Sequence, residues 1–198
     1  DALNAGLNLA ISKCEVVPPS GTDCVVDKNL FEGWIWHEDG CFKLLGAPFG
    51  SAEFCESEVR KGVERADVFF EALRKYNDAQ GCYSLLKQCG NWCKLVYSAR
   101  VVPPCLHSGA LGSFRNCLWR ALEHVAGEGI DVRNWDLVQL SIANGGLVIR
   151  DPVRYAAVAY LCSLSHCKEI CGSIDPCFDC EDTYGGLWMA DICLNSAG

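Results

Sequence analysis

Apolar residues recur at helical spacing from residue 52 onwards. In the first such segment they lie four, three, four and three positions apart, at Val59, Val63, Ala66, Phe70 and Leu73. This spacing predicts a helix with one buried face, and Ser51 is a suitable residue to cap its N-terminus. Similar patterns predict four more helices, over about 85–102, 111–125, 135–142 and 151–164.

Proline, glycine and capping residues support these helix limits. Pro103-Pro104 follows the second helix and Gly127 closes the third, because proline cannot continue a helix and glycine adopts the left-handed conformation common just after one. Asp151-Pro152 provides an N-cap residue followed by proline in the first turn. We therefore expect a bundle of about five helices over 52–165.

The first 51 residues show strand-like patterns instead. Cys14 to Val17 predicts a short strand that ends at Pro18-Pro19. Two apolar runs, 30–37 and 41–45, flank Glu38-Asp39-Gly40, which is a hairpin signal. We expect an α+β fold, mainly α, with a small N-terminal antiparallel sheet over 1–51, the helical bundle over 52–165 and a cysteine-rich, loop-like region over 166–198.

Aromatic residues are dense in the predicted sheet. Phe31 belongs to its expected core, but Trp34, Ile35 and Trp36 are consecutive, so apolar and polar residues do not alternate cleanly. Both faces of that strand therefore carry apolar side chains, and one face requires a cover from further protein. Exposed aromatic clusters typically mark interaction surfaces, and we expect a partner surface made of Trp34, Trp36, Phe42 and Phe49.

Charge and hydropathy limit the function classes. The net charge of the 198-residue chain is −8, which argues against nucleic-acid binding and against docking on anionic lipid, since both need basic surfaces. A local basic patch is still compatible with this total. No apolar run reaches the length of a membrane-spanning helix, so membrane association would be peripheral, through a membrane complex.

Fifteen cysteines are far more than a chain of this length usually carries. We expect disulfides in the C-terminal cluster, which favours an oxidising compartment, lumenal or secreted, over the cytosol or nucleus. The alternatives are free thiols, or a zinc site built from His166, Cys167, Cys177 and Cys180; no other cofactor is indicated. The cluster consists of Cys162, Cys167, Cys171, Cys177, Cys180 and Cys193.

Four segments in order resemble one protein family. They are Gly-Leu-Asn-Leu-Ala-Ile-Ser-Lys-Cys-Glu (6–15), Phe-Lys-Leu-Leu-Gly-Ala-Pro-Phe-Gly-Ser (42–51), Trp-Cys-Lys-Leu-Val-Tyr-Ser-Ala-Arg (92–100) and Asn-Gly-Gly-Leu-Val-Ile-Arg-Asp (144–151). Together they resemble the C-terminal palm, primer-grip and thumb region of a reverse transcriptase of the non-LTR retrotransposon kind.

This resemblance implies roles for particular residues. Lys13 matches the palm lysine that assists departure of pyrophosphate, which is general-acid chemistry. The segment 42–51, with Leu45, Gly46, Phe49 and Gly50, matches the primer-grip hairpin, and 52–165 matches the thumb. The family's metal-binding aspartates would precede residue 1, and the chain contains no Asp-Asp pair.

We therefore expect a non-catalytic protein derived from a reverse transcriptase, acting as a structural or accessory subunit of a larger protein assembly. One alternative is the C-terminal fragment of an active reverse transcriptase, an RNA-directed DNA polymerase. A second alternative is a zinc-dependent nucleic-acid-binding module.

Overall fold

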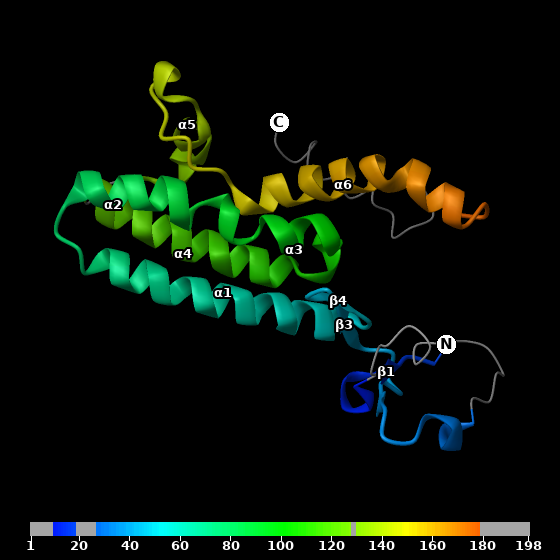
Figure 1. The fold of residues 1–198 in the computed structure, drawn as a ribbon. Helices are drawn as coiled ribbons and strands as arrows, with labels where there is room; N and C mark the ends of the chain where they lie inside the picture. The colour runs from blue at the N-terminus through cyan, green and yellow to red at the C-terminus, as the bar shows by residue number, and fades with distance from the viewer. Residues whose placement is uncertain (1–9, 19–26, 128–129, 179–198) are drawn as a thin grey trace.

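The computed structural model describes residues 10–18, 27–127 and 130–178. A small N-terminal region of short strands leads into a helical bundle at the start of the first long helix (Figure 1). This α+β, mainly helical architecture confirms the predicted fold class. The N-terminal elements are η2 (Ile11–Lys13), β1 (Glu15–Val16), η3 (Lys28–Phe31), β2 (Ile35–Trp36), β3 (Phe42–Leu44) and β4 (Ala47–Phe49).

The predicted hairpin across Glu38-Asp39-Gly40 is wrong in its strand partners. The turn itself forms, because the Gly40 N–H donates to the His37 carbonyl over 3.0 Å. However, β2 before the turn pairs in parallel with β1, and β3 after it pairs antiparallel with β4. The antiparallel hairpin therefore lies one strand further along the chain.

The β3–β4 hairpin turns at Leu45 and Gly46. Both residues have positive φ, 51° and 86°, which is the type I′ geometry that matches the twist of two antiparallel strands. The Tyr97 hydroxyl donates to the Leu45 carbonyl over 2.6 Å. This bond ties the tip of the hairpin to the helical bundle.

Helix α1 (Ala52–Arg74) confirms the first helical prediction. The Ser51 hydroxyl caps it by accepting a hydrogen bond from the Phe54 N–H, at 3.2 Å. The five apolar positions predicted to share a face are all buried, and Cys55 joins them.

The second predicted helix is broken in the middle. The chain forms α2 (Ala79–Leu85), a π-helical turn η4 (Leu86–Gly90), a 3-10 turn η5 (Trp92–Lys94) and α3 (Val96–Val101). Asn91 is the break, with extended backbone angles of φ −72° and ψ −159°. Its side chain bonds to a distant segment, and this tertiary contact outweighs the local helical pattern.

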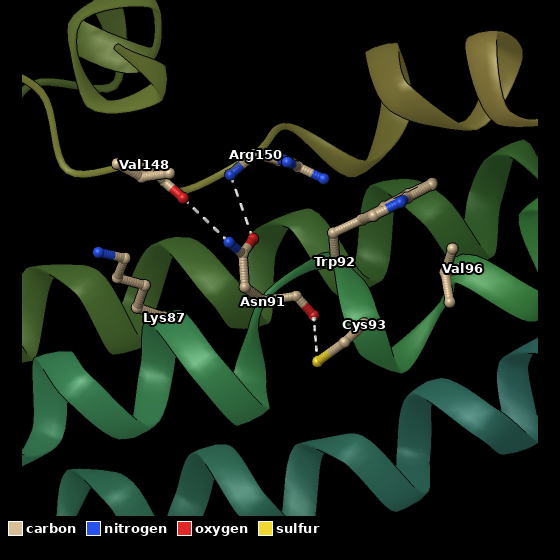
Figure 2. Close-up of a pocket in the computed structure, with 7 residues that line it drawn as sticks. All are labelled: Lys87, Asn91, Trp92, Cys93, Val96, Val148 and Arg150. Atoms are coloured by element: carbon tan, nitrogen blue, oxygen red, sulfur yellow. Dashed lines mark hydrogen bonds between the residues drawn. The ribbon is translucent and has the colours of Figure 1, made fainter. Parts of the chain in front are cut away.

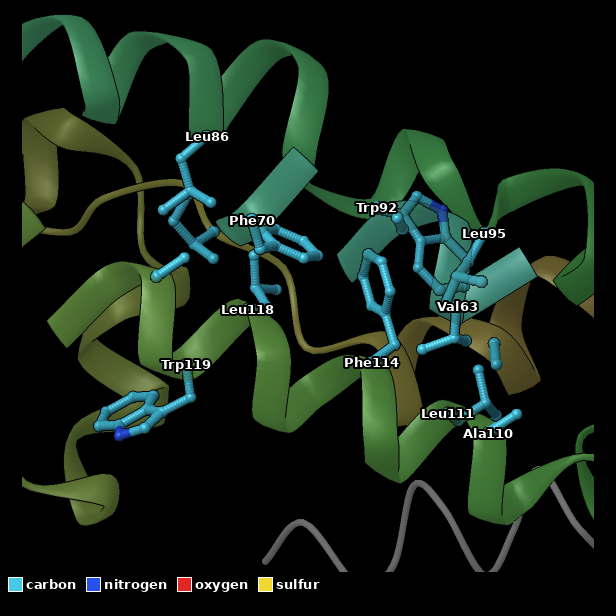
Figure 3. Close-up of a cluster of buried hydrophobic side chains, with 14 of the residues drawn as sticks. Val63, Phe70, Leu86, Trp92, Leu95, Ala110, Leu111, Phe114, Leu118 and Trp119 are labelled. Carbon is cyan, nitrogen blue, oxygen red and sulfur yellow. The ribbon is translucent and has the colours of Figure 1, made fainter. Parts of the chain in front are cut away.

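Helix α4 (Ser108–Ala126) ends at Gly127 with φ 79°, as predicted. Phe114 on α4 meets Phe70 on α1 edge to face, with ring centroids 5.5 Å apart, at the centre of the core (Figure 3). Short helical elements flank α4: η6 (Pro104–Leu106) precedes it, and η7 (Val132–Asn134), α5 (Trp135–Gln139) and η8 (Ile142–Asn144) lie between it and the last helix. Helix α5 confirms the fourth predicted helix but ends at Gln139.

Helix α6 (Pro152–Ile174) begins as predicted, with the Asp151 carboxylate accepting from the Val153 N–H at 3.0 Å. It does not end near residue 164, so the loop-like start expected for the region 166–198 is wrong up to Ile174. Apolar groups continue at helical spacing through Leu164, Cys167, Cys171 and Ile174. The second half of α6 runs on beyond the bundle (Figure 1).

Candidate functional site

The N-terminal region exposes its apolar side chains. Among the described residues before Ala47, none is buried. Three large apolar side chains of the β3–β4 hairpin are exposed, Leu44 to 56 %, Leu45 to 91 % and Phe49 to 41 %. We call these three residues the hairpin surface. Leu30, Ile11 and Ile35 are also exposed on the neighbouring elements η3, η2 and β2.

The aromatic residues predicted as a partner surface form two separate clusters. The Phe31 ring lies edge-on to Trp34 and Trp36, at centroid distances of 5.2 and 6.0 Å. On the hairpin, Phe42 stacks on Phe49 at 5.4 Å. Trp34, Trp36 and Phe42 are half-buried by these contacts. Phe49 is thus the most exposed member of the predicted set.

The residues matched to the primer grip gather on one hairpin. Leu45 and Gly46 form its tip, and Phe49 lies on β4. Gly50 has φ 130°, and a Cβ there would lie 2.6 Å from the Cys41 Sγ, so only glycine fits. Lys13, matched to the palm lysine, lies apart from the hairpin on η2, with its side chain exposed.

The described cysteines are free thiols, so the expected disulfides stay a prediction. Cys162, Cys167 and Cys171 follow one another along α6, and Cys177 lies beyond its end. Cys180 and Cys193 lie outside the described residues. Deeper in the bundle, burial is the main reason why the pKa of the Cys117 thiol is raised to about 11. That thiol is a small apolar group at neutral pH.

The predicted zinc ligands are only partly described. His166 and Cys167 are adjacent in α6, Cys177 follows the helix, and Cys180 lies outside the described residues. Within the part of the chain that the structure describes, no three His, Cys, Asp or Glu side chains converge as metal ligands would. The zinc site stays a prediction.

A pocket of about 350 Å³ opens between the broken helix and the segment that precedes α6 (Figure 2). Lys87, Trp92 and Val96 contribute one wall, and Val148 and Arg150 contribute the other. The sequence interpretation missed this site. One signal was available: residues 79–122 carry five basic side chains, Lys87, Lys94, Arg100, Arg115 and Arg120, and no acidic one.

No protein-family model, curated protein or solved structure matches this chain. The resemblance to a reverse transcriptase therefore stays a prediction. None of the helices in the described ranges combines the length and hydropathy needed to cross a membrane.

Proposed function

We propose that this chain is a non-catalytic helical module, derived from a reverse transcriptase, that serves as a structural subunit of a larger protein assembly. The hairpin surface of Leu44, Leu45 and Phe49 is its docking site. The observation that carries the proposal is the exposure of these side chains, above all Leu45 at 91 %. Covering such groups with a partner removes apolar area from water, worth roughly 25 cal/mol per Å².

The hairpin's attachment to the bundle supports the proposal. The Tyr97 bond fixes its tip, and Lys43 on β3 forms an ion pair with Glu58 on α1. A surface held on two sides loses little conformational freedom when a partner binds, and such pre-organisation favours affinity. The hairpin thus combines exposed apolar groups with a fixed backbone.

Site-specific photo-cross-linking in the native cells tests this. A photoreactive benzoylphenylalanine at position 45 should give a cross-link to one discrete protein. The matched control carries the same group in place of Val68, an apolar residue on α1 that is 71 % exposed. Equal background from both positions, together with a native chain that elutes as a monomer from those cells, would refute docking at the hairpin.

A second candidate is the C-terminal part of an active reverse transcriptase. It is favoured by the β3–β4 hairpin running directly into α1 through the Ser51 cap, which is the order of primer grip and thumb that the resemblance implies. In that case the cover of the hairpin surface is the palm of the same polypeptide.

Transcript sequencing and a polymerase assay separate the two candidates. The second requires an Asp-Asp motif encoded in frame upstream of Asp1, and primer extension by the whole gene product on an RNA template. A transcript that encodes no such motif, with a discrete partner cross-linked at position 45, supports the structural subunit. An active whole product with an intramolecular cross-link supports the polymerase.

A further inference from the structure

The pocket between η4 and the segment before α6 has walls locked in place by one side chain. Asn91 is 7 % exposed. Its amide nitrogen donates to the Val148 carbonyl at 3.0 Å, and its amide oxygen accepts from the Arg150 N–H at 3.1 Å. These two bonds join segments 57 and 59 residues apart in the sequence (Figure 2). The fold therefore builds the pocket before any ligand arrives.

Backbone strain is concentrated in the same wall. Val148 has φ 57°, a conformation that a β-branched residue adopts only when its surroundings impose it, at a cost of about 1–3 kcal/mol. Its N–H donates to the Leu140 carbonyl at 3.0 Å, and its own carbonyl accepts from Asn91. Strain of this kind clusters at functional sites and ligand clamps.

The charge of the pocket is opposite to that of the chain. Lys87 and Arg150 line it, and no acidic residue does, although the net charge is −8. The structure assigns neither cation an ion pair within the described residues; each lies over a tyrosine ring, Lys87 at 6.0 Å from Tyr83 and Arg150 at 5.2 Å from Tyr155. Both cationic charges thus stay uncompensated by a carboxylate and available to an anion.

A second hollow on the molecule differs from the pocket in its charge. It has about 440 Å³ and is lined on α1 and β3 by cations and acids together. There Lys43 and Lys61 both pair with Glu58. Its three cations, Lys43, Lys61 and Arg65, face two acids, Glu58 and Glu64. That hollow therefore carries less net positive charge than the pocket, attracts an anion less, and provides a control of similar size.

We propose that the pocket at Asn91 binds a small amphipathic organic anion. The anionic group, a carboxylate, sulfonate or phosphate, is attracted by the charges of Lys87 and Arg150, which flank the pocket on opposite sides of Asn91 (Figure 2), and an apolar body lies against Val96 and the edge of Trp92. The volume is within the range of small-molecule sites, and such sites combine apolar walls with a few polar groups. The pocket and the hairpin surface lie on different elements, so either proposal can fail without the other.

Calorimetric titration with three probes of nearly the same shape tests the proposal: naphthalenesulfonate, naphthalenemethanol and naphthylmethylammonium. We expect the sulfonate to bind about tenfold or more tightly than the alcohol, the ammonium to bind weakest, and the preference to shrink as salt rises. In the Lys87→Gln/Arg150→Gln variant, the sulfonate should fall to the affinity of the alcohol. The amide NMR signals of Cys93 and Val148, which line the pocket, should shift with each probe that binds, and at the lowest concentration with the sulfonate.

The matched control is Lys61→Gln/Arg65→Gln, which removes the same charge from the second hollow and should leave sulfonate binding unchanged. Urea midpoints of both variants verify that they fold. Equal affinities for sulfonate and alcohol, or equal losses in the two double variants, would overturn the proposal. It is also wrong if Lys87→Gln/Arg150→Gln abolishes binding of a short single-stranded oligonucleotide while the sulfonate never binds, because the cations then serve a phosphate backbone.

Discussion

Replacing Asn91 by alanine should destabilise the bundle by about 2–3 kcal/mol. The change removes the hydrogen bonds to Val148 and Arg150, at 3.0 and 3.1 Å, each worth about 0.5–1.5 kcal/mol net. It also leaves a backbone carbonyl and an N–H without protein partners, which adds to the loss. Both groups border an open pocket, so water can reach them, and the total stays below the cost of two fully buried groups.

Urea unfolding followed by circular dichroism measures this loss. At a slope of about 2 kcal/mol per molar urea, the midpoint should fall by about 1 M or more, with the slope itself unchanged. Asn144→Ala is the matched control, because the Asn144 side chain is exposed, and surface changes of this kind stay within about 0.5 kcal/mol. If Asn91→Ala and Asn144→Ala shift the midpoint equally, the clamp assigned to Asn91 does not exist.

A second substitution at the same position separates hydrogen bonding from shape. Asn91→Asp preserves the side-chain volume and the acceptor for the Arg150 N–H, but it places an oxygen opposite the Val148 carbonyl. At neutral pH the loss should equal or exceed that of Asn91→Ala. In acid the new carboxyl regains a proton to donate, and the gap between this variant and the wild type should narrow. A variant as stable as the wild type at neutral pH would mean that only the shape of the side chain matters.

Three further predictions use the same urea assay. Phe114→Ala should cost about 3–5 kcal/mol, because it opens a cavity at the centre of the core, and a loss below about 1 kcal/mol would contradict that placement. Burial lowers the pKa of His107, so the unfolded chain binds the proton more readily than the folded one. The stability that neutral His107 contributes should be full above the ordinary pKa of about 6.5 and should fall as the pH drops through that value. His107→Gln should remove this part of the pH dependence, and an unchanged profile would refute the argument. Gly50→Ala should lower the free energy of unfolding by about 2 kcal/mol or more, since it combines positive φ with a clash against Cys41. Gly62→Ala inside α1, where nothing obstructs a Cβ, should instead raise it by about 0.5–1 kcal/mol.

The sequence predicts the long helices well because their limits are set locally. Ser51 and Asp151 each cap the helix that follows through their own side chains, and Gly127 takes the positive φ that ends α4. These interactions involve residues within one helical turn of each other. Reading apolar spacing and capping residues is enough to find them.

Tertiary contacts and unusual residue choices explain the sequence-based predictions that the structure contradicts. The break at Asn91 depends on bonds to a segment more than fifty residues away, which no local pattern contains. The local pattern favours a hairpin at Asp39-Gly40, and only the resemblance implies one within 42–51, because leucine rarely takes the left-handed conformation that Leu45 adopts. The end of α6 has a different cause: a dense run of cysteines favours a loop, whereas Cys167 and Cys171 occupy the helix as small apolar groups.

The candidate sites likewise differ in whether the local sequence indicates them. Phe49 is predicted from the aromatic residues of its segment and Gly50 through the resemblance, whose implied primer-grip role stays a prediction. The anion pocket is not predicted, since its two cations, Lys87 and Arg150, are 63 positions apart in the numbering. Its only local trace is the lack of acidic residues over 79–122.

The uneven burial of α6 divides one continuous helix into two thermodynamic units. Its buried residues, Pro152, Ala156, Ala157 and Tyr160, all lie in the first half, whereas Ile170 and Ile174 near its end are 63 % and 79 % exposed. A helical segment as short as 161–174 is marginal in water without tertiary packing. Amide hydrogens beyond Tyr160 should therefore exchange through local opening of the second half alone, and those before it only when the whole bundle unfolds.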